Sequence, residues 1–137
     1  MNIEYRKDMS GITEDMLAGF FVGWPSSPSP ATHLKILQSS YRCYVALDKN
    51  SGKVIGFINA ISDGILSAYI PLLEVLEPYK GKGIGSELVR LMLDELDGFY
   101  MVDICHDAEL GSFYAKFGAC KGNSSIFRNF RAQSGKN

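Results

Sequence analysis

The sequence lacks the features that would assign it to a membrane, disulfide-rich, zinc-binding or nucleic-acid-binding class. It has only three cysteines, Cys43, Cys105 and Cys120, with no CxxC pair, which argues against a disulfide framework and a zinc ribbon. No apolar run approaches the roughly 18 to 20 residues that span a bilayer, and residues 1–10 contain no apolar signal core. Fourteen basic residues oppose fifteen acidic ones, so the net charge of −1 provides no general attraction for nucleic acids or anionic membranes. We expect a soluble, cytoplasmic protein that binds no metal, nucleic acid or membrane.

The length and composition suit one compact domain. The chain has 137 residues, of which 46% are hydrophobic and 21% charged. These values support one sizeable core and leave no room for two ordinary domains. We expect a single domain over residues 1–137, with an ordered core over about 2–130 and a polar C-terminal tail.

Strand and helix signals alternate along the chain. Alternating apolar residues indicate strands, and apolar residues at spacings of three and four indicate helices, most clearly in the run that follows Ile84. The expected strands cover 2–6, 42–47, 53–61, 65–76, 99–105 and 124–130, and the expected helices cover 13–22, 31–39, 84–96 and 107–117. The fold class is therefore α+β, with a mixed central sheet flanked by helices in the order β-α-α-β-β-β-α-β-α-β.

Two features of this order point to a ligand site. The segment 72–105 forms a βαβ crossover, whose strands are parallel neighbours, and ligands favour the carboxyl ends of such strands. Pro71 lies inside the strand 65–76, where a proline indicates an edge, a bulge or a break in the hydrogen-bonded ladder.

A glycine-rich loop, 78–86, joins this strand to the following helix. Gly81, Gly83 and Gly85 occupy alternate positions, and glycine allows positive φ angles and close approach of a phosphate to the backbone. The free N–H groups would converge at the positive end of the helix dipole. The same glycines could instead serve only a tight turn. The loop fits neither a P-loop, which requires GxxxxGK[ST], nor the dinucleotide fingerprint GxGxxG.

The loop and a second segment resemble the GNAT superfamily of acetyl-CoA-dependent N-acetyltransferases. The family signature, Arg or Gln followed by x-x-Gly-x-Gly/Ala, is similar to 80–85, with Lys80 in the first position. The second segment, Asp107 with 113–119, resembles the family's asparagine, tyrosine and glycine pattern, with aspartate for asparagine and alanine for the final phenylalanine. The order of elements agrees over about residues 2–130.

The resemblance implies a binding site for acetyl-CoA between splayed strands. It implies that the pantetheine pairs with the strand backbone at Leu73, Glu74 and Val75, and that Lys80 and Asp107 contact the cofactor. It also implies that the pyrophosphate lies on a run of backbone N–H groups, which belong to Gly81, Lys82, Gly83, Ile84, Gly85 and Ser86. Dimers are common in similar folds, so a homodimer is possible.

The resemblance also implies a direct transfer of the acetyl group to a primary amine. Tyr114 matches the family's tyrosine that protonates the leaving sulfur. A phenol with a pKa of about 10 can donate a proton to a thiolate whose acid has a pKa of about 8.5. The backbone N–H of Val75 would hold the thioester carbonyl. A non-catalytic sensor that binds CoA or a nucleotide is the alternative function.

The base and the acceptor are less well defined by the sequence. Glu74 is the candidate base, with Asp63 and Asp103 as further carboxylates. His106 is expected to be structural, and Cys105 to be a buried thiol that faces away from it. The candidate substrate contacts are Phe21, Trp24 and Tyr69, and the identity of the amine stays open.

Overall fold

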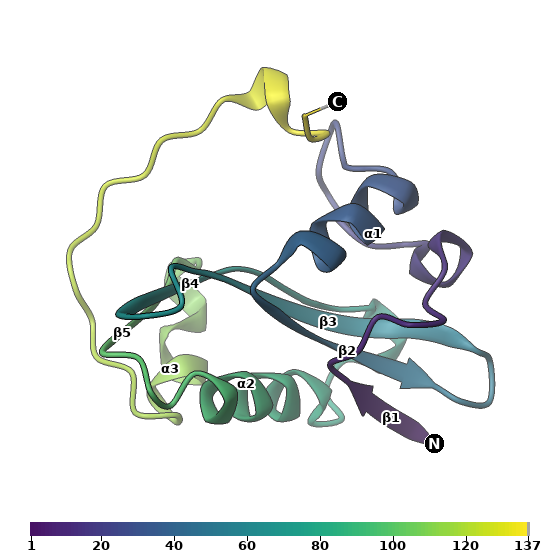
Figure 1. Cartoon of the computed structure of the whole chain (residues 1–137), viewed down its shortest axis with the longest axis horizontal. Coiled ribbons are helices and arrows are strands. Elements are labelled where there is room, and N and C mark those ends of the chain that lie inside the picture. The colour runs from purple at the N-terminus through teal and green to yellow at the C-terminus, as the bar shows by residue number, and fades with distance from the viewer. Residues whose placement is uncertain (137) are drawn as a thin grey trace.

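The protein forms one mixed five-stranded sheet within residues 1–136, the part of the chain that the computed structural model describes (Figure 1). The sheet order follows the chain order. Neighbouring strands are antiparallel from β1 to β4, and β4 and β5 are parallel. The strands are β1 (Ile3–Arg6), β2 (Arg42–Asp48), β3 (Lys53–Ser62), β4 (Ser67–Val75) and β5 (Met101–Ile104). The expected α+β class and the parallel crossover are confirmed.

Helices cover both faces of the sheet (Figure 1). The helix α1 (Pro30–Ser39) and the 3₁₀ turn η1 (Glu14–Leu17) lie on one face, and α2 (Ile84–Glu95) lies on the other with the short α3 (Gly111–Ala115). Because successive strand residues face opposite sides, Phe57 packs toward α1 and the next residue, Ile58, packs toward α2.

The two longer helices begin where the sequence predicts. The Ser29 hydroxyl accepts a hydrogen bond from the Thr32 N–H (3.1 Å), and Pro30 occupies the first helical position of α1. The α2 helix buries Ile84, Leu88 and Met92, which lie on one helical stripe. None of the helices within residues 1–136 is long and apolar enough to cross a membrane.

The strand β4 is irregular at Pro71. Asn59 of β3 faces Leu72, whereas Ile61 faces Tyr69, so β4 contains one extra residue at this point. Pairing of β4 with β5 ends at Ile70. The expected distortion at Pro71 is confirmed, and it separates the second half of β4 from β5.

Three expectations about elements are wrong. Residues 124–130 form no strand and pair with none of the strands within residues 1–136. The helix expected over 13–22 is only the turn η1, since Gly19 and Phe21 adopt positive φ angles of 98° and 63°. The helix expected over 107–117 is a 3₁₀ turn, η3 (Ala108–Leu110), followed by α3. The β5 strand is half-exposed, and within residues 1–136 no further strand pairs with its outer edge.

Candidate functional site

The second half of β4, residues 71–75, does not pair with β5, and this open half presents backbone groups to the gap between the two strands. The Leu76 N–H donates to the Ile55 carbonyl (2.9 Å), so the N–H and C=O groups of even-numbered residues here point toward β3. Backbone groups alternate in direction along a strand. Those of Leu73 and Val75 therefore point away from β3, toward the gap in which β5 offers no partner.

The glycine loop adds a run of free N–H groups. Within residues 1–136, the six N–H groups from Gly81 to Ser86 have no protein acceptor. Gly83 caps α2 with a φ angle of +84°, and Gly81 has a φ angle of +75°, conformations that L-residues with a side chain adopt at a cost. These N–H groups lie at the positive end of the α2 dipole, so the loop can bind an anion.

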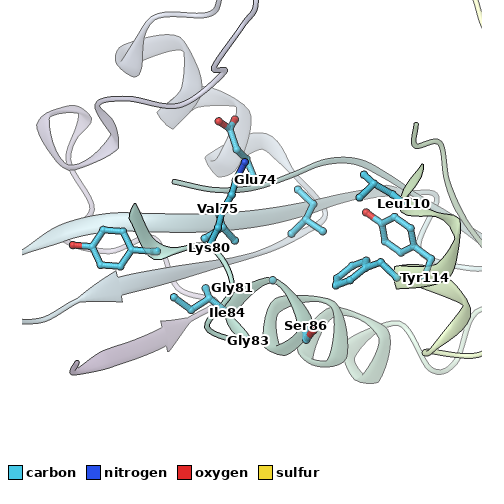
Figure 2. Close-up of a pocket in the computed structure, with 13 residues that line it drawn as sticks. Glu74, Val75, Lys80, Gly81, Gly83, Ile84, Ser86, Leu110 and Tyr114 are labelled. Atoms are coloured by element: carbon cyan, nitrogen blue, oxygen red, sulfur yellow. The ribbon is translucent and has the colours of Figure 1, made fainter. Parts of the chain in front are cut away.

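The open strand, the loop and α3 enclose a cavity of about 440 Å³ (Figure 2). In Figure 2, the Val75 and Glu74 side chains point to opposite sides of the strand, and the Tyr114 ring extends from α3 toward the cavity. The lining residues are Leu73, Glu74, Val75, Tyr79, Lys80, Gly81, Gly83, Ile84, Gly85, Ser86, Leu110, Phe113 and Tyr114. Most of the residues that the resemblance implied for the cofactor are therefore brought together.

Tyr114 lies where this cavity meets a second one. Its ring is buried, stacks on His106 (ring centroids 4.8 Å apart, 28° between planes) and contacts Phe113 edge-on. Burial raises the pKa of the Tyr114 hydroxyl above its ordinary value. The phenol is therefore protonated at neutral pH and can donate a proton.

The second cavity, of about 480 Å³, opens on the α1 face of the sheet. Its aromatic wall includes Phe21, Trp24 and Phe57, with Phe21 and Trp24 in ring contact (centroids 4.9 Å apart). It shares Leu73, Glu74, Lys80, Leu110 and Tyr114 with the first cavity. A molecule bound in the second cavity would thus reach the groups that line the first.

Glu74 fixes the shape of this aromatic wall. Its carboxylate accepts hydrogen bonds from the backbone N–H groups of Phe21 (2.8 Å) and Val22 (3.3 Å). Phe21 has a φ angle of 63°, which is costly for a bulky residue and persists only where surrounding contacts enforce it. Glu74 supplies that enforcement, a positioning role that the sequence did not suggest.

His106, for which the sequence predicts a structural role, also lines the second cavity. Its Nδ1 lies 2.7 Å from the Asp107 carbonyl oxygen, which can only accept a hydrogen bond. The neutral ring therefore carries its proton on Nδ1 and leaves the Nε2 lone pair free. The position directly after β5 was the available signal, because carboxyl ends of parallel strands favour ligands.

Other candidates from the sequence lie elsewhere. The Lys82 ammonium faces the Tyr79 ring (5.9 Å) rather than lining the first cavity, and Asp107 lines only the second cavity. Tyr69 lines neither cavity. Lys80 lines both, and its ammonium pairs with Glu77 (3.0 Å).

Asp63, one of the further carboxylates named from the sequence, is a turn carboxylate, whereas the expected burial of Cys105 is wrong. The Asp63 carboxylate accepts three backbone N–H groups of the β3–β4 turn, which lower its pKa, so it has a structural role away from both cavities. Cys105 is exposed rather than buried, because it follows the last residue of the uncovered β5. Within residues 1–136, no cluster of three or more His, Cys, Asp or Glu side chains could hold a metal ion.

Comparisons with known proteins agree with this geometry. The model of the acetyltransferase (GNAT) family matches residues 9–119. A crystal structure of a Deinococcus radiodurans R1 protein assigned to the acetyltransferases is similar at 41% identity and a TM-score of 0.95, covering 98% of this chain and 94% of that one. A GNAT family acetyltransferase from Streptococcus pneumoniae TIGR4 has 25% identity and a TM-score of 0.67, with coverages of 93% and 98%.

More distant structures share the fold alone. Glucosamine-6-phosphate N-acetyltransferase from Arabidopsis thaliana has 16% identity and a TM-score of 0.70, covering 95% of this chain and 99% of that one. Among curated proteins, none matches the sequence significantly. The family match spans most of the chain, and it supports an acyltransferase rather than the sensor considered as the alternative. The chain belongs to the acetyltransferase (GNAT) family.

Proposed function

We propose that the protein transfers the acetyl group of acetyl-CoA directly to a primary amine, with Tyr114 as the general acid. One observation carries this proposal: the free loop N–H groups, the open edge of β4 and the Tyr114 ring line a single cavity that joins a second, aromatic cavity. The GNAT family generally uses acetyl-CoA. The three free cysteines favour a reducing, cytoplasmic setting.

The first cavity suits acetyl-CoA because its polar groups are mainly backbone groups. Residues Gly81 to Ser86 would hold the pyrophosphate by N–H groups, with the helix dipole and Lys80 adding positive charge. The backbone groups of Leu73 and Val75 would pair with the pantetheine amides as a strand does. The Val75 N–H would then stabilise the negative charge that develops on the thioester oxygen.

Tyr114 would protonate the departing thiolate. The phenol, whose pKa is raised by burial, is protonated at neutral pH. Because Tyr114 lines both cavities, it would lie beside the reacting groups. General acid catalysis of this kind contributes roughly 10² to 10⁴ in rate.

For removal of the amine proton, His106 is better placed than Glu74. Both line the second cavity. The Glu74 oxygens already accept two backbone N–H groups, whereas the Nε2 lone pair of His106 is free. His106, acting directly or through a water molecule, is therefore our proposed base, and Glu74, the candidate from the sequence, is the alternative.

The second cavity indicates what kind of amine it would accept. Phe21, Trp24 and Phe57 offer aromatic surface, and Glu74 and Asp107 place carboxylates at the cavity that can attract a protonated amine before it loses its proton. We propose an acceptor with an apolar body and a primary amine.

Two measurements test the proposed function. Acetyl-CoA should raise the melting temperature in a concentration-dependent way, as any ligand of the folded state does. Release of the CoA thiol should depend on added amine and should be fastest with arylalkylamines in a panel that also holds aliphatic amines, aminoglycosides and lysine peptides. No thermal shift together with no amine-dependent thiol release would sink the proposal.

A further inference from the structure

A third cavity, of about 220 Å³, lies on the α2 face of the sheet. Most of its lining side chains belong to the apolar cluster that packs α2 against the strands. They come from the sheet, from α2 and from the residues after α3, and they include Ile58, Ile70, Val89, Leu93, Phe117 and Ala119. Folded interiors contain few voids larger than a water molecule, so a cavity of this size in an apolar cluster is unusual.

The lining of the third cavity suits an aliphatic group. Among the described residues that line it, only Tyr114 has a polar side-chain atom. An ordered water molecule needs two to four polar partners, which this lining does not supply. An apolar cavity of about 150 Å³ takes up a benzene molecule, so this cavity has room for a hydrocarbon group of similar or larger size.

Small residues keep the outer end of this cavity open. Gly118 and Ala119 line that end, and both are exposed. The φ angle of Gly118 is +91°, which disfavours any residue with a side chain. The family pattern that this segment resembles ends in phenylalanine, whereas this chain has Ala119. A single methyl group therefore stands where a ring would narrow the cavity.

Tyr114 joins the third cavity to the two that form the proposed site. It lines all three cavities, and Ile104 lines both the second and the third. Ile70 and Ile104 are the last paired residues of β4 and β5, and both line the third cavity. The cavity therefore begins where the two strands separate, at the reacting end of the proposed site.

The chemistry of acyl transfer places four groups around one carbon atom. Under attack, the carbonyl carbon carries the CoA sulfur, the amine nitrogen, the oxygen and the acyl chain. Under the proposed function, on which this inference rests, the sulfur lies in the first cavity, the amine in the second and the oxygen at the Val75 N–H. The acyl chain is the fourth group, and the third cavity is the apolar space that remains beside Tyr114.

A further cavity beside Tyr114, of about 490 Å³, is less suitable for a hydrocarbon chain. Its lining includes the thiols of Cys105 and Cys120 and the Lys121 side chain. An alkyl chain placed there would take polar groups out of water without offering them hydrogen bonds, which is unfavourable. The third cavity imposes no such cost.

We propose that the protein accepts saturated acyl-CoA donors longer than acetyl-CoA, with an acyl chain of about four to six carbons in the third cavity. The amine nitrogen attacks the acyl carbonyl carbon, so the C–N bond forms and the C–S bond breaks. The amine proton passes to the base, and Tyr114 supplies the proton that the CoA thiolate takes up. Acetyl-CoA leaves the cavity unfilled, whereas a butyryl or hexanoyl chain covers its apolar surface.

Binding of a series of donors tests this inference without depending on turnover. Titration calorimetry of the wild-type protein would compare acetyl-, propionyl-, butyryl- and hexanoyl-CoA in the absence of amine. Each additional buried CH₂ group should lower the dissociation constant about three- to fourfold, so butyryl-CoA should bind about tenfold more tightly than acetyl-CoA. A dissociation constant that stays level or rises with chain length would overturn the inference.

Substitutions show whether the third cavity causes this preference. Ala119→Phe adds a ring at the exposed end of the cavity and should bring the ratio of the acetyl-CoA to the butyryl-CoA dissociation constant close to one. Ala132→Phe makes the same change at an exposed position that does not line this cavity, and it should keep the tenfold ratio. Leu93→Phe enlarges a half-buried residue of the α2 wall and should act as Ala119→Phe does. A tenfold ratio in both Ala119→Phe and Leu93→Phe would contradict the inference.

The same measurements separate this inference from the proposed function. If acetyl-CoA binds and releases its thiol with an amine, but longer donors bind no more tightly, only the role of the third cavity fails. If none of the donors binds, the proposed function fails as well.

Discussion

The two cavities that meet at Tyr114 differ in whether backbone groups or side chains provide most of their lining. The first is formed by a bulged strand, a glycine loop and a helix terminus, so its polar groups are mainly backbone groups. The second is formed by side chains from separate segments, among them Phe21, Trp24, Phe57 and His106. A backbone site fixes a ligand that all members of a family share, whereas a side-chain site can change its ligand by substitution. This difference supports our proposal that acetyl-CoA binds in the first cavity and the amine in the second.

Tyr114 stands between the cavities, and its removal should have the largest effect. We expect Tyr114→Phe to lower kcat by about 10² to 10⁴ without changing the acetyl-CoA dissociation constant, because only proton donation is lost. Steady-state thiol release and titration calorimetry measure the two quantities.

Tyr79→Phe is the matched control for this change. Tyr79 lines the same cavity, but its hydroxyl donates to Asp48 (2.9 Å), so kcat should stay near the wild-type value. Similar kcat values for Tyr114→Phe and the wild type would remove Tyr114 from the mechanism.

Acid should lower the stability of the folded protein through His33, which lies behind the aromatic wall of the second cavity. His33 is buried against Phe20, Phe21 and Phe57 (ring centroids 5.3, 4.9 and 4.3 Å away), and neither ring nitrogen has a hydrogen-bond partner within residues 1–136. Burial lowers the pKa of His33 to about 4. The unfolded chain takes up this proton near pH 6.5, so the folded state loses stability as the pH falls from about 6.5 toward 4.

Between pH 7 and pH 5, proton uptake by His33 on unfolding should lower the free energy of unfolding by roughly 2 kcal/mol. His33→Leu should remove this component, and urea unfolding of both proteins at pH 7 and pH 5 measures it. An unchanged difference between the two pH values would show that His33 takes up no proton on unfolding in this range.

Gly85→Ala tests the first cavity without disturbing the fold. A Cβ atom at Gly85 would lie 3.7 Å from Val75 Cγ2, an ordinary contact, and its φ angle is not positive. Alanine should therefore keep or raise stability by about 0.5 to 1 kcal/mol, yet weaken acetyl-CoA binding by about tenfold, because the methyl group occupies the cavity. Gly98→Ala, in open space outside the cavity, should leave binding unchanged. Full affinity in Gly85→Ala would place the cofactor elsewhere.

Glu74→Gln should have the smallest effect and should be confined to the second cavity. The amide oxygen can still accept one hydrogen bond from Phe21 or Val22, so we expect a loss of about 1 kcal/mol in stability and a few-fold rise in KM for the amine.

His106→Gln should instead lower kcat by about 10² or more. The reverse pattern would make Glu74 the base.

The same comparison explains what the sequence could predict. Gly81, Gly83 and Pro71 have backbone consequences that depend on local sequence, so the loop and the bulge were predictable. Glu74 accepts a hydrogen bond from the Phe21 N–H, 53 residues away, and the His106 ring stacks on Tyr114. Such contacts exist only after folding. The strand expected over 124–130 failed for a related reason, because strand formation requires a partner strand as well as a favourable sequence.

The most direct test of the two-cavity account is amide hydrogen exchange of the wild-type protein with and without acetyl-CoA. Acetyl-CoA should slow exchange at the amides of 81–86 and at Leu73 and Val75, since these N–H groups lack acceptors within residues 1–136 and would gain them from the ligand. The amides of 21–24 should change only when an amine substrate is added. Protection at 21–24 with acetyl-CoA alone, and none at 81–86, would contradict the account.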